Sequence, residues 1–166
     1  MFKICSEVNA IMAESPERRA LSFSSLEEAV ADAEKLAAGK VRTTGKHSFA
    51  LILKQLAITH DMATGKIKAP RPPFLMRLLM PLLKGMILRG PVKPGIKLPR
   101  AAEEFFWPDQ EVDVQEALAH FKQSVENYKR NGPLEVHPFF GKATREQLDR
   151  LNCGHCAMHL SFVHPA

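Results

Sequence analysis

The sequence predicts an all-α fold, a four-helix bundle in which a long, basic and proline-rich crossover over residues 65–110 joins the second and third helices. Three observations favour this fold: four amphipathic segments follow helical spacing, no pair of strands is apparent, and prolines concentrate in the crossover. The length of 166 residues suits one domain. Residues 1–22 show no sustained periodicity and are expected to form a loosely ordered extension before a helical domain over 23–166.

The first two helices are delimited by capping residues and glycines. Ser25 and Glu28 have the spacing of a capping box, so a helix is predicted to begin at Ser25 and to end before Gly39. A second helix is predicted over Lys46–Thr64, with Gly65 as its stop. The side of this helix expected to face solvent carries residues seven apart, namely His47, Lys54 and Asp61.

The crossover cannot be one long helix. Between Met62 and Ala102 there is no acidic residue, but there are nine basic residues and seven of the twelve prolines. A short helix is predicted over Phe74–Leu88, bent or broken at Pro81 and followed by an irregular arm. We interpret the segment as a solvated crossover whose leucines cover the core. The alternative is an interaction protein that uses the basic arm over 66–100 to bind an anionic membrane surface or an acidic partner.

The last two helices begin with the same capping signal. Asp113 and Glu116 have capping-box spacing at the start of the third helix, and Gly132 ends it. Thr144 and Gln147 repeat the spacing at the start of a fourth helix, which is predicted to continue into the C-terminal residues as far as His159-Leu160-Ser161-Phe162.

Charge and cysteine content exclude several classes of protein. The chain has 23 lysines and arginines against 18 aspartates and glutamates, a net charge of +5, which is too low a density for a nucleic-acid-coating protein. Three cysteines do not make a secreted disulfide framework, and the N-terminus lacks the apolar run of a signal peptide, so a cytoplasmic location is expected. The most apolar stretch is too short to cross a bilayer, so no transmembrane segment is predicted.

The fourth helix carries a histidine pair with metal-ligand spacing. His155 and His159 lie four residues apart on an apolar stripe, so both imidazoles are expected to face the interior, near enough to share one divalent ion. A third ligand would have to come from the second helix, which offers Gln55 and, as a rival, His60. The amide of Gln55 is a poor zinc ligand, and the direction of His60 depends on helix rotation. Without an ion, Gln55 would be a buried amide bonded to an imidazole and His60 a surface residue near a helix end.

A second pattern overlaps the histidine pair. Cys153 and Cys156 form a C-x-x-C motif around Gly154 and His155, a dipeptide found in strongly oxidising disulfide-exchange enzymes. Those enzymes place the motif at a helix N-terminus, where the helix dipole lowers the thiol pKa, whereas here it falls inside the fourth helix. The two cysteines are therefore interpreted as small packed or surface residues, with a redox role and a metal-bound Cys156 thiolate as the alternatives.

The C-terminal part of the chain also carries a recognisable combination of strings, HPFFGK at 137–142 and HLSF at 159–162. Weaker strings extend the pattern over most of the chain from about residue 18, among them VRTTGK at 41–46 and PGIKLP at 94–99. Together they resemble the DinB/YfiT-like helical-bundle superfamily, and more narrowly a bacterial branch catalogued as a domain of unknown function.

The resemblance implies a bundle with one metal pocket, built from one histidine of the second helix and the His-x-x-x-His pair of the last. His155 and His159 match the pair, whereas Gln55 stands where the second-helix histidine precedes Leu-Ala. Characterised relatives include metal-dependent thiol transferases and thiol-dependent isomerases, in which the ion would hold a low-molecular-weight thiol as thiolate. Related bundles often pair as homodimers.

We therefore expect a DinB-like bundle whose central pocket is retained and whose ion site is degenerate, a binding protein with either a divalent metal (zinc or nickel) or no ion. The alternative is a metal-dependent thiol S-transferase in which His155 and His159 hold the ion, with Gln55, His60 or water completing the shell. The expected partners are a small-molecule thiol and a second copy of the chain.

Overall fold

The chain is mostly helical with small strands. The computed structural model describes residues 17–70 and 72–166, so most of the extension predicted over 1–22 lies outside the described residues. The described part contains, in chain order, α1 (Leu26–Ala37), β1 (Val41–Thr43), α2 (Phe49–Ala63), α3 (Phe74–Arg89), α4 (Arg100–Phe106), α5 (Val114–Asn131), β2 (Val136–His137), β3 (Gly141–Lys142), α6 (Arg145–Leu160) and β4 (Val163–Pro165).

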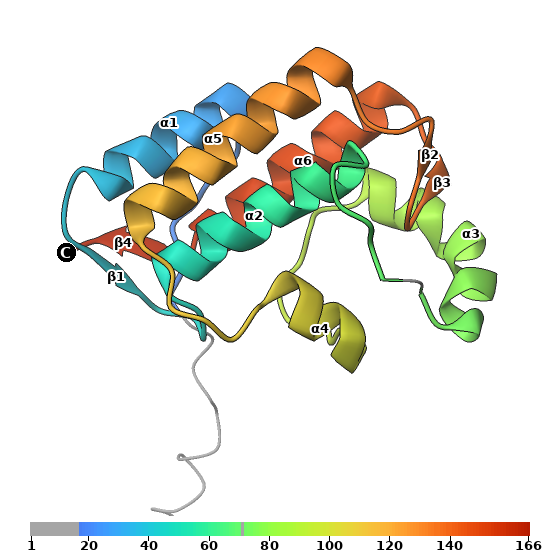
Figure 1. The fold of residues 1–166 in the computed structure, drawn as a ribbon, viewed down its shortest axis with the longest axis horizontal. Helices are drawn as coiled ribbons and strands as arrows, with labels where there is room; N and C mark the ends of the chain where they lie inside the picture. Colours follow the sequence, from blue (N-terminus) through green and yellow to red (C-terminus); the bar gives the residue numbers. More distant parts are fainter. Residues whose placement is uncertain (1–16, 71) are drawn as a thin grey trace, which may run out of the picture.

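The four helices of the predicted bundle correspond to α1, α2, α5 and α6, which lie side by side (Figure 1). The helix α2 packs mainly against α5 and also touches α6, while α1 packs against both α5 and α6. Side chains from nearly every position of α2 are buried, and Leu53, Leu56 and Ala57 have no exposed surface. The polar residues of α2 are therefore held inside the protein with its apolar ones.

The burial of α2 corrects two expectations about its polar residues. Asp61 was placed on the solvent side, but it is only 2% exposed, and its carboxylate contacts Lys66 and the Nε2 atom of His120 from α5. His60, whose ion-free interpretation was a surface residue, has no exposed surface at all. Both expectations assumed that one side of the helix is exposed to solvent, whereas α5 and its neighbours enclose α2.

The helix starts follow the capping residues. The hydroxyl of Ser25 accepts the amide hydrogen of Glu28, and Asp113 accepts those of Gln115 and Glu116. Thr144 and Gln147 form the complete reciprocal capping box at the start of α6. The start of α2 was predicted three residues too early, at Lys46, because the helix is capped by Ser48, whose hydroxyl accepts the amide hydrogen of Leu51.

The two short strand pairs were not foreseen. β1 pairs antiparallel with β4, which ties the C-terminus to the connection between α1 and α2, and β2 pairs antiparallel with β3. Each strand has only two or three residues, too few for an alternating apolar pattern to be visible in the sequence. Because β4 follows directly, α6 also ends at Leu160 rather than at Phe162.

The crossover contains more helix than predicted. α3 continues through Pro81 to Arg89, since a proline inside a helix removes one backbone hydrogen bond and does not always break it. A further helix, α4, occupies part of the arm that was expected to be irregular. No helix among the described residues is both long and apolar enough to cross a membrane.

Candidate functional site: a buried histidine and glutamine cluster

The two histidines of α6 point at each other. His155 and His159 lie one turn apart, with their ring centroids 4.6 Å apart and their Nε2 atoms 3.0 Å apart. Both side chains are half-buried. A contact of this length requires one Nε2 to carry a hydrogen and the other to accept it, so the two rings hold complementary tautomers.

The side-chain amide of Gln55, on α2, lies next to these two imidazoles. Its Nε2 atom lies 3.4 Å from Nε2 of His155 and 3.3 Å from the hydroxyl of Thr59, while its Oε1 atom has no partner among the described residues. Gln55 is 5% exposed, so water does not readily satisfy that oxygen. The structure thus brings together three of the four predicted site residues, Gln55, His155 and His159, which we call the polar cluster.

The fourth predicted residue, His60, lies near enough to the polar cluster for its charge to lower the pKa of His155, but its own contacts are with α2 and α5. Its Nδ1 atom donates to the carbonyl of Leu56 at 2.7 Å, and its ring packs against Phe121 and Tyr128 of α5. No hydrogen bond joins His60 to the polar cluster within the described part of the chain. The ring of His60, which was the rival candidate for a third ligand, therefore packs against α5.

Burial keeps the histidines of the polar cluster neutral. It lowers the pKa of His155 well below its ordinary value, and the neighbouring His159 lowers that pKa further. Burial also lowers the pKa of His159 to about 4. A neutral imidazole is the form that binds a metal ion or exchanges hydrogen bonds, so both rings are available for either role at neutral pH.

An aromatic stack lies beside the cluster, and no pattern in the sequence predicted it. The ring of Trp107, just after α4, meets His159 edge to face at 5.4 Å. The same indole stacks on His47 with ring centroids 3.6 Å apart and an angle of 7° between the planes. His47 had been assigned to the solvent side of the second helix, but it precedes α2 and lies in the connection that reaches Trp107.

The two cysteines of α6 are unsuited to redox chemistry. Cys153 and Cys156 are free thiols, 6% and 0% exposed. Burial raises the pKa of Cys153 to about 11 and raises that of Cys156 further. A redox or metal-binding cysteine needs a lowered pKa and access, so packing accounts for both residues better than either alternative.

The fit of the polar cluster to a metal ion is incomplete. Two nitrogens held about 2.1 Å from one ion at the tetrahedral angle lie about 3.4 Å apart, so the two Nε2 atoms, 3.0 Å apart, have the spacing of a hydrogen bond and would have to separate slightly to bind a tetrahedral ion. The donor set does not match, because three-ligand zinc sites combine histidine with further histidine, carboxylate or thiolate, and no group of three such side chains that could hold a metal occurs in residues 17–70 and 72–166. A neutral amide is a weak substitute, so the residues present do not make a complete ion site.

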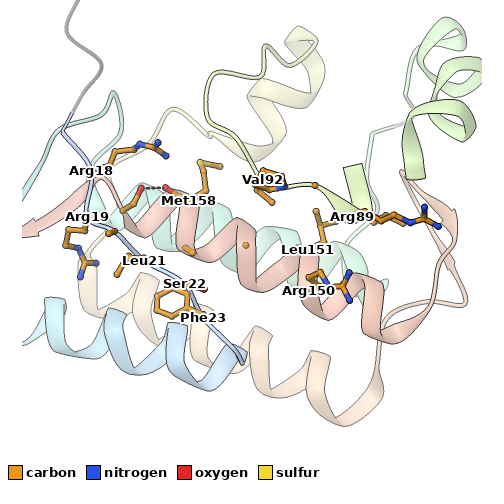
Figure 2. Close-up of a pocket in the computed structure, with 17 residues that line it drawn as sticks. Arg18, Arg19, Leu21, Ser22, Phe23, Arg89, Val92, Arg150, Leu151 and Met158 are labelled. Atoms are coloured by element: carbon orange, nitrogen blue, oxygen red, sulfur yellow. Dashed lines mark hydrogen bonds between the residues drawn. The ribbon is translucent and has the colours of Figure 1, made fainter. Parts of the chain in front are cut away.

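A surface cleft lies elsewhere. A surface cleft of about 630 Å³ runs along another side of α6 (Figure 2), and its described lining includes Arg18, Arg89, Val92, Arg150 and Met158 but no member of the polar cluster. Figure 2 shows Arg18 toward one end of this cleft and Arg89 with Arg150 toward the other. Its chemistry is therefore separate from that of the two imidazoles.

Comparison with known proteins places the chain in one family. A family model described as "Protein of unknown function (DUF1569)" matches residues 15–166. No curated protein and no solved structure matches the chain. The match covers every element described above, including the polar cluster.

Proposed function

The chain belongs to the DUF1569 family of proteins of unknown function, and we propose that it is a DinB/YfiT-like bundle protein whose ion site has become an ion-free binding cluster. The neutral imidazoles of His155 and His159, with the amide of Gln55, then bind a small polar molecule by hydrogen bonds. The observation that carries this proposal is the buried Oε1 atom of Gln55, which lacks a partner beside two mutually bonded imidazoles.

The ligand must complete the hydrogen bonding of the cluster. A buried acceptor without a partner costs about 1–3 kcal/mol, so a hydrogen-bond donor that reaches Gln55 Oε1 is stabilised there. His155 Nε2 already faces both His159 and Gln55 and cannot satisfy both, because one ring nitrogen has either one hydrogen or one lone pair. A molecule with adjacent donor and acceptor groups suits this arrangement.

Zinc and nickel titrations test the proposal. Calorimetry of the protein without a histidine tag should show no tight binding of either ion, since the third strong ligand is missing. Gln55→His should restore the full ligand set and tighten binding by about a hundredfold or more. Gln55→Glu, which adds a charged oxygen of the same length, is the matched variant and should give an intermediate affinity. Tight binding by the parent protein would contradict the proposal.

The second candidate is the metal-dependent thiol S-transferase. It is favoured by the two neutral imidazoles of His155 and His159, which lie one helical turn apart on the same side of α6. We derive no reaction step from it, because the donor set is incomplete. A small-molecule thiol as substrate, a homodimer and a cytoplasmic location remain predictions.

A further inference from the structure

The helix α3 presents a wide apolar face to solvent. Figure 1 shows it at one end of the molecule, beyond the four long helices. Of the 16 residues in α3, seven large apolar side chains are between 41% and 79% exposed: Phe74, Leu75, Leu78, Leu79, Leu82, Leu83 and Met86. An exposed apolar surface of this extent marks a site of interaction.

These side chains occupy one side of the helix. Phe74, Leu78, Leu82 and Met86 follow each other at steps of four, and Leu75, Leu79 and Leu83 form a second row. At about 100° per residue the two rows together cover about half of the helix circumference. Leu88, near the end of α3, is buried at 2% exposure, and the helix contacts α6. The exposed half is therefore a continuous apolar face with nothing from the described chain packed on it.

The helix α3 also carries positive charge, with Arg77 and Lys84 on the side opposite the apolar face and Arg89 at the C-terminal end of the face. Arg77, Lys84 and Arg89 belong to α3, and none of them forms an ion pair with any residue that the structure describes. The chain has no acidic residue between Met62 and Ala102, against nine basic ones. Arg150 of α6 lines the same cleft as Arg89 (Figure 2), although it also forms an exposed ion pair with Glu146.

We propose that α3 binds the surface of an anionic membrane, lying in the plane of the interface with its apolar face among the acyl chains. Arg89 then meets the phosphate and carboxylate groups of the lipids, and Arg77 and Lys84 on the opposite side of the helix add attraction within the Debye length of the anionic surface. At 16 residues the helix lies on the bilayer without crossing it. The proposal is independent of the polar cluster.

Charge favours a membrane over a second copy of the chain. A two-fold interface places the same patch of both subunits face to face, so the cations of α3 would lie near the same cations of the second copy. Like charges at an interface oppose association, whereas an anionic lipid surface attracts every one of them. The excess positive charge of α3 is thus complementary to an anionic lipid surface and not to a second copy of the chain.

Vesicle sedimentation tests this proposal with the full chain. The wild type should sediment with vesicles of phosphatidylcholine and phosphatidylserine, bind vesicles of phosphatidylcholine alone far less, and be released by salt. The double variant Leu78→Glu with Leu82→Glu should lower binding about tenfold or more, and Arg77→Gln with Lys84→Gln about fivefold for each cation removed. Val136→Glu, an exposed apolar residue on β2 at 56% exposure, is the matched control and should still bind.

Three outcomes would overturn the proposal. The first is equal binding to both kinds of vesicle or to neither. The second is a loss of binding in Val136→Glu as large as in the α3 variants, which would mean that added negative charge alone is responsible. The third is a wild type that does not bind vesicles and forms a dimer in light scattering, together with leucine variants that are monomers. That result would assign the face to a second copy of the chain. Circular dichroism confirms that each variant is folded.

Discussion

The indole ring of Trp107 meets the imidazole ring of His159 edge to face, with 5.4 Å between the ring centroids. This contact joins the crossover to the last helix, because Trp107 follows α4 directly and His159 lies in the final turn of α6. The indole therefore forms one wall of the polar cluster beside His159.

Removing the ring that stacks on Trp107 should change its fluorescence. His47→Ala deletes the stacked imidazole, exposes one face of the indole to water and shifts the emission maximum to longer wavelength. Trp107 is the single tryptophan of the chain, so the emission spectrum reports on it alone. The control is Lys46→Ala, at the exposed neighbouring position. An unchanged spectrum in His47→Ala would argue against the stack.

The hydroxyl of Tyr128 should contribute measurably to stability. It donates to Oδ1 of Asp149 at 2.8 Å and so joins α5 to α6, while its ring has no exposed surface. Tyr128→Phe keeps the ring and removes this hydrogen bond, so the free energy of unfolding should fall by about 1–2 kcal/mol in urea titrations. Arg130→Ala breaks only an exposed ion pair with Glu126 and should lower the free energy of unfolding by about 0.3–0.5 kcal/mol. Equal effects of the two variants would contradict the assignment.

His137 should make stability depend on pH. Burial lowers its pKa to about 4, and its Nδ1 atom accepts the amide hydrogens of Phe139 and Phe140. Because the pKa is lower in the folded than in the unfolded state, the stabilisation is complete above pH about 6.5 and is lost as pH falls toward 4, by about 3 kcal/mol in total.

His137→Asn separates this contribution from those of the other histidines. The Asn side-chain oxygen can accept the same amide hydrogens but does not titrate, so the variant should lose less stability than the wild type between pH 6.5 and 4. Urea unfolding at several pH values provides the measurement. Parallel curves for the two proteins would mean that His137 is not the titrating group.

The thiols of α6 should resist oxidation and labelling. Cys156 is fully buried, and burial raises the pKa of both Cys153 and Cys156, so little thiolate forms at neutral pH. In a Cys5→Ser background, a thiol reagent should react slowly with the native protein and rapidly after unfolding. Rapid labelling in the native state, or a disulfide between the two, would restore the redox interpretation.

The signals that predicted the fold well are local ones. The capping residues Ser25, Asp113 and Thr144 place three helix starts, because a cap is a bond between a side chain and its own first turn. The pair His155 and His159 was predicted to share one face because four residues make about one helical turn. The convergence of Gln55 on them was expected from the family resemblance, and the structure brings the three together.

The signals that failed depend on distant parts of the chain. Asp61 and His60 were predicted to be exposed to solvent, because nothing in the sequence of α2 alone shows that other helices enclose this helix. β1 and β4 pair residues at least 120 positions apart, such as Thr43 with Val163, over strands too short to have a pattern. Trp107 reaches the polar cluster only because α4 turns the crossover back toward α2, and no spacing in the sequence encodes that contact.

The metal content of the protein as purified tests the central claim most directly. Elemental analysis of protein made without a histidine tag, in medium containing zinc and nickel, should find well under one ion per chain, because Gln55 leaves His155 and His159 without a third strong ligand. Gln55→His, made and purified in parallel, should carry about one ion per chain. A stoichiometric ion in the parent protein that disappears in His155→Ala would contradict the account and establish an ion site built on the amide.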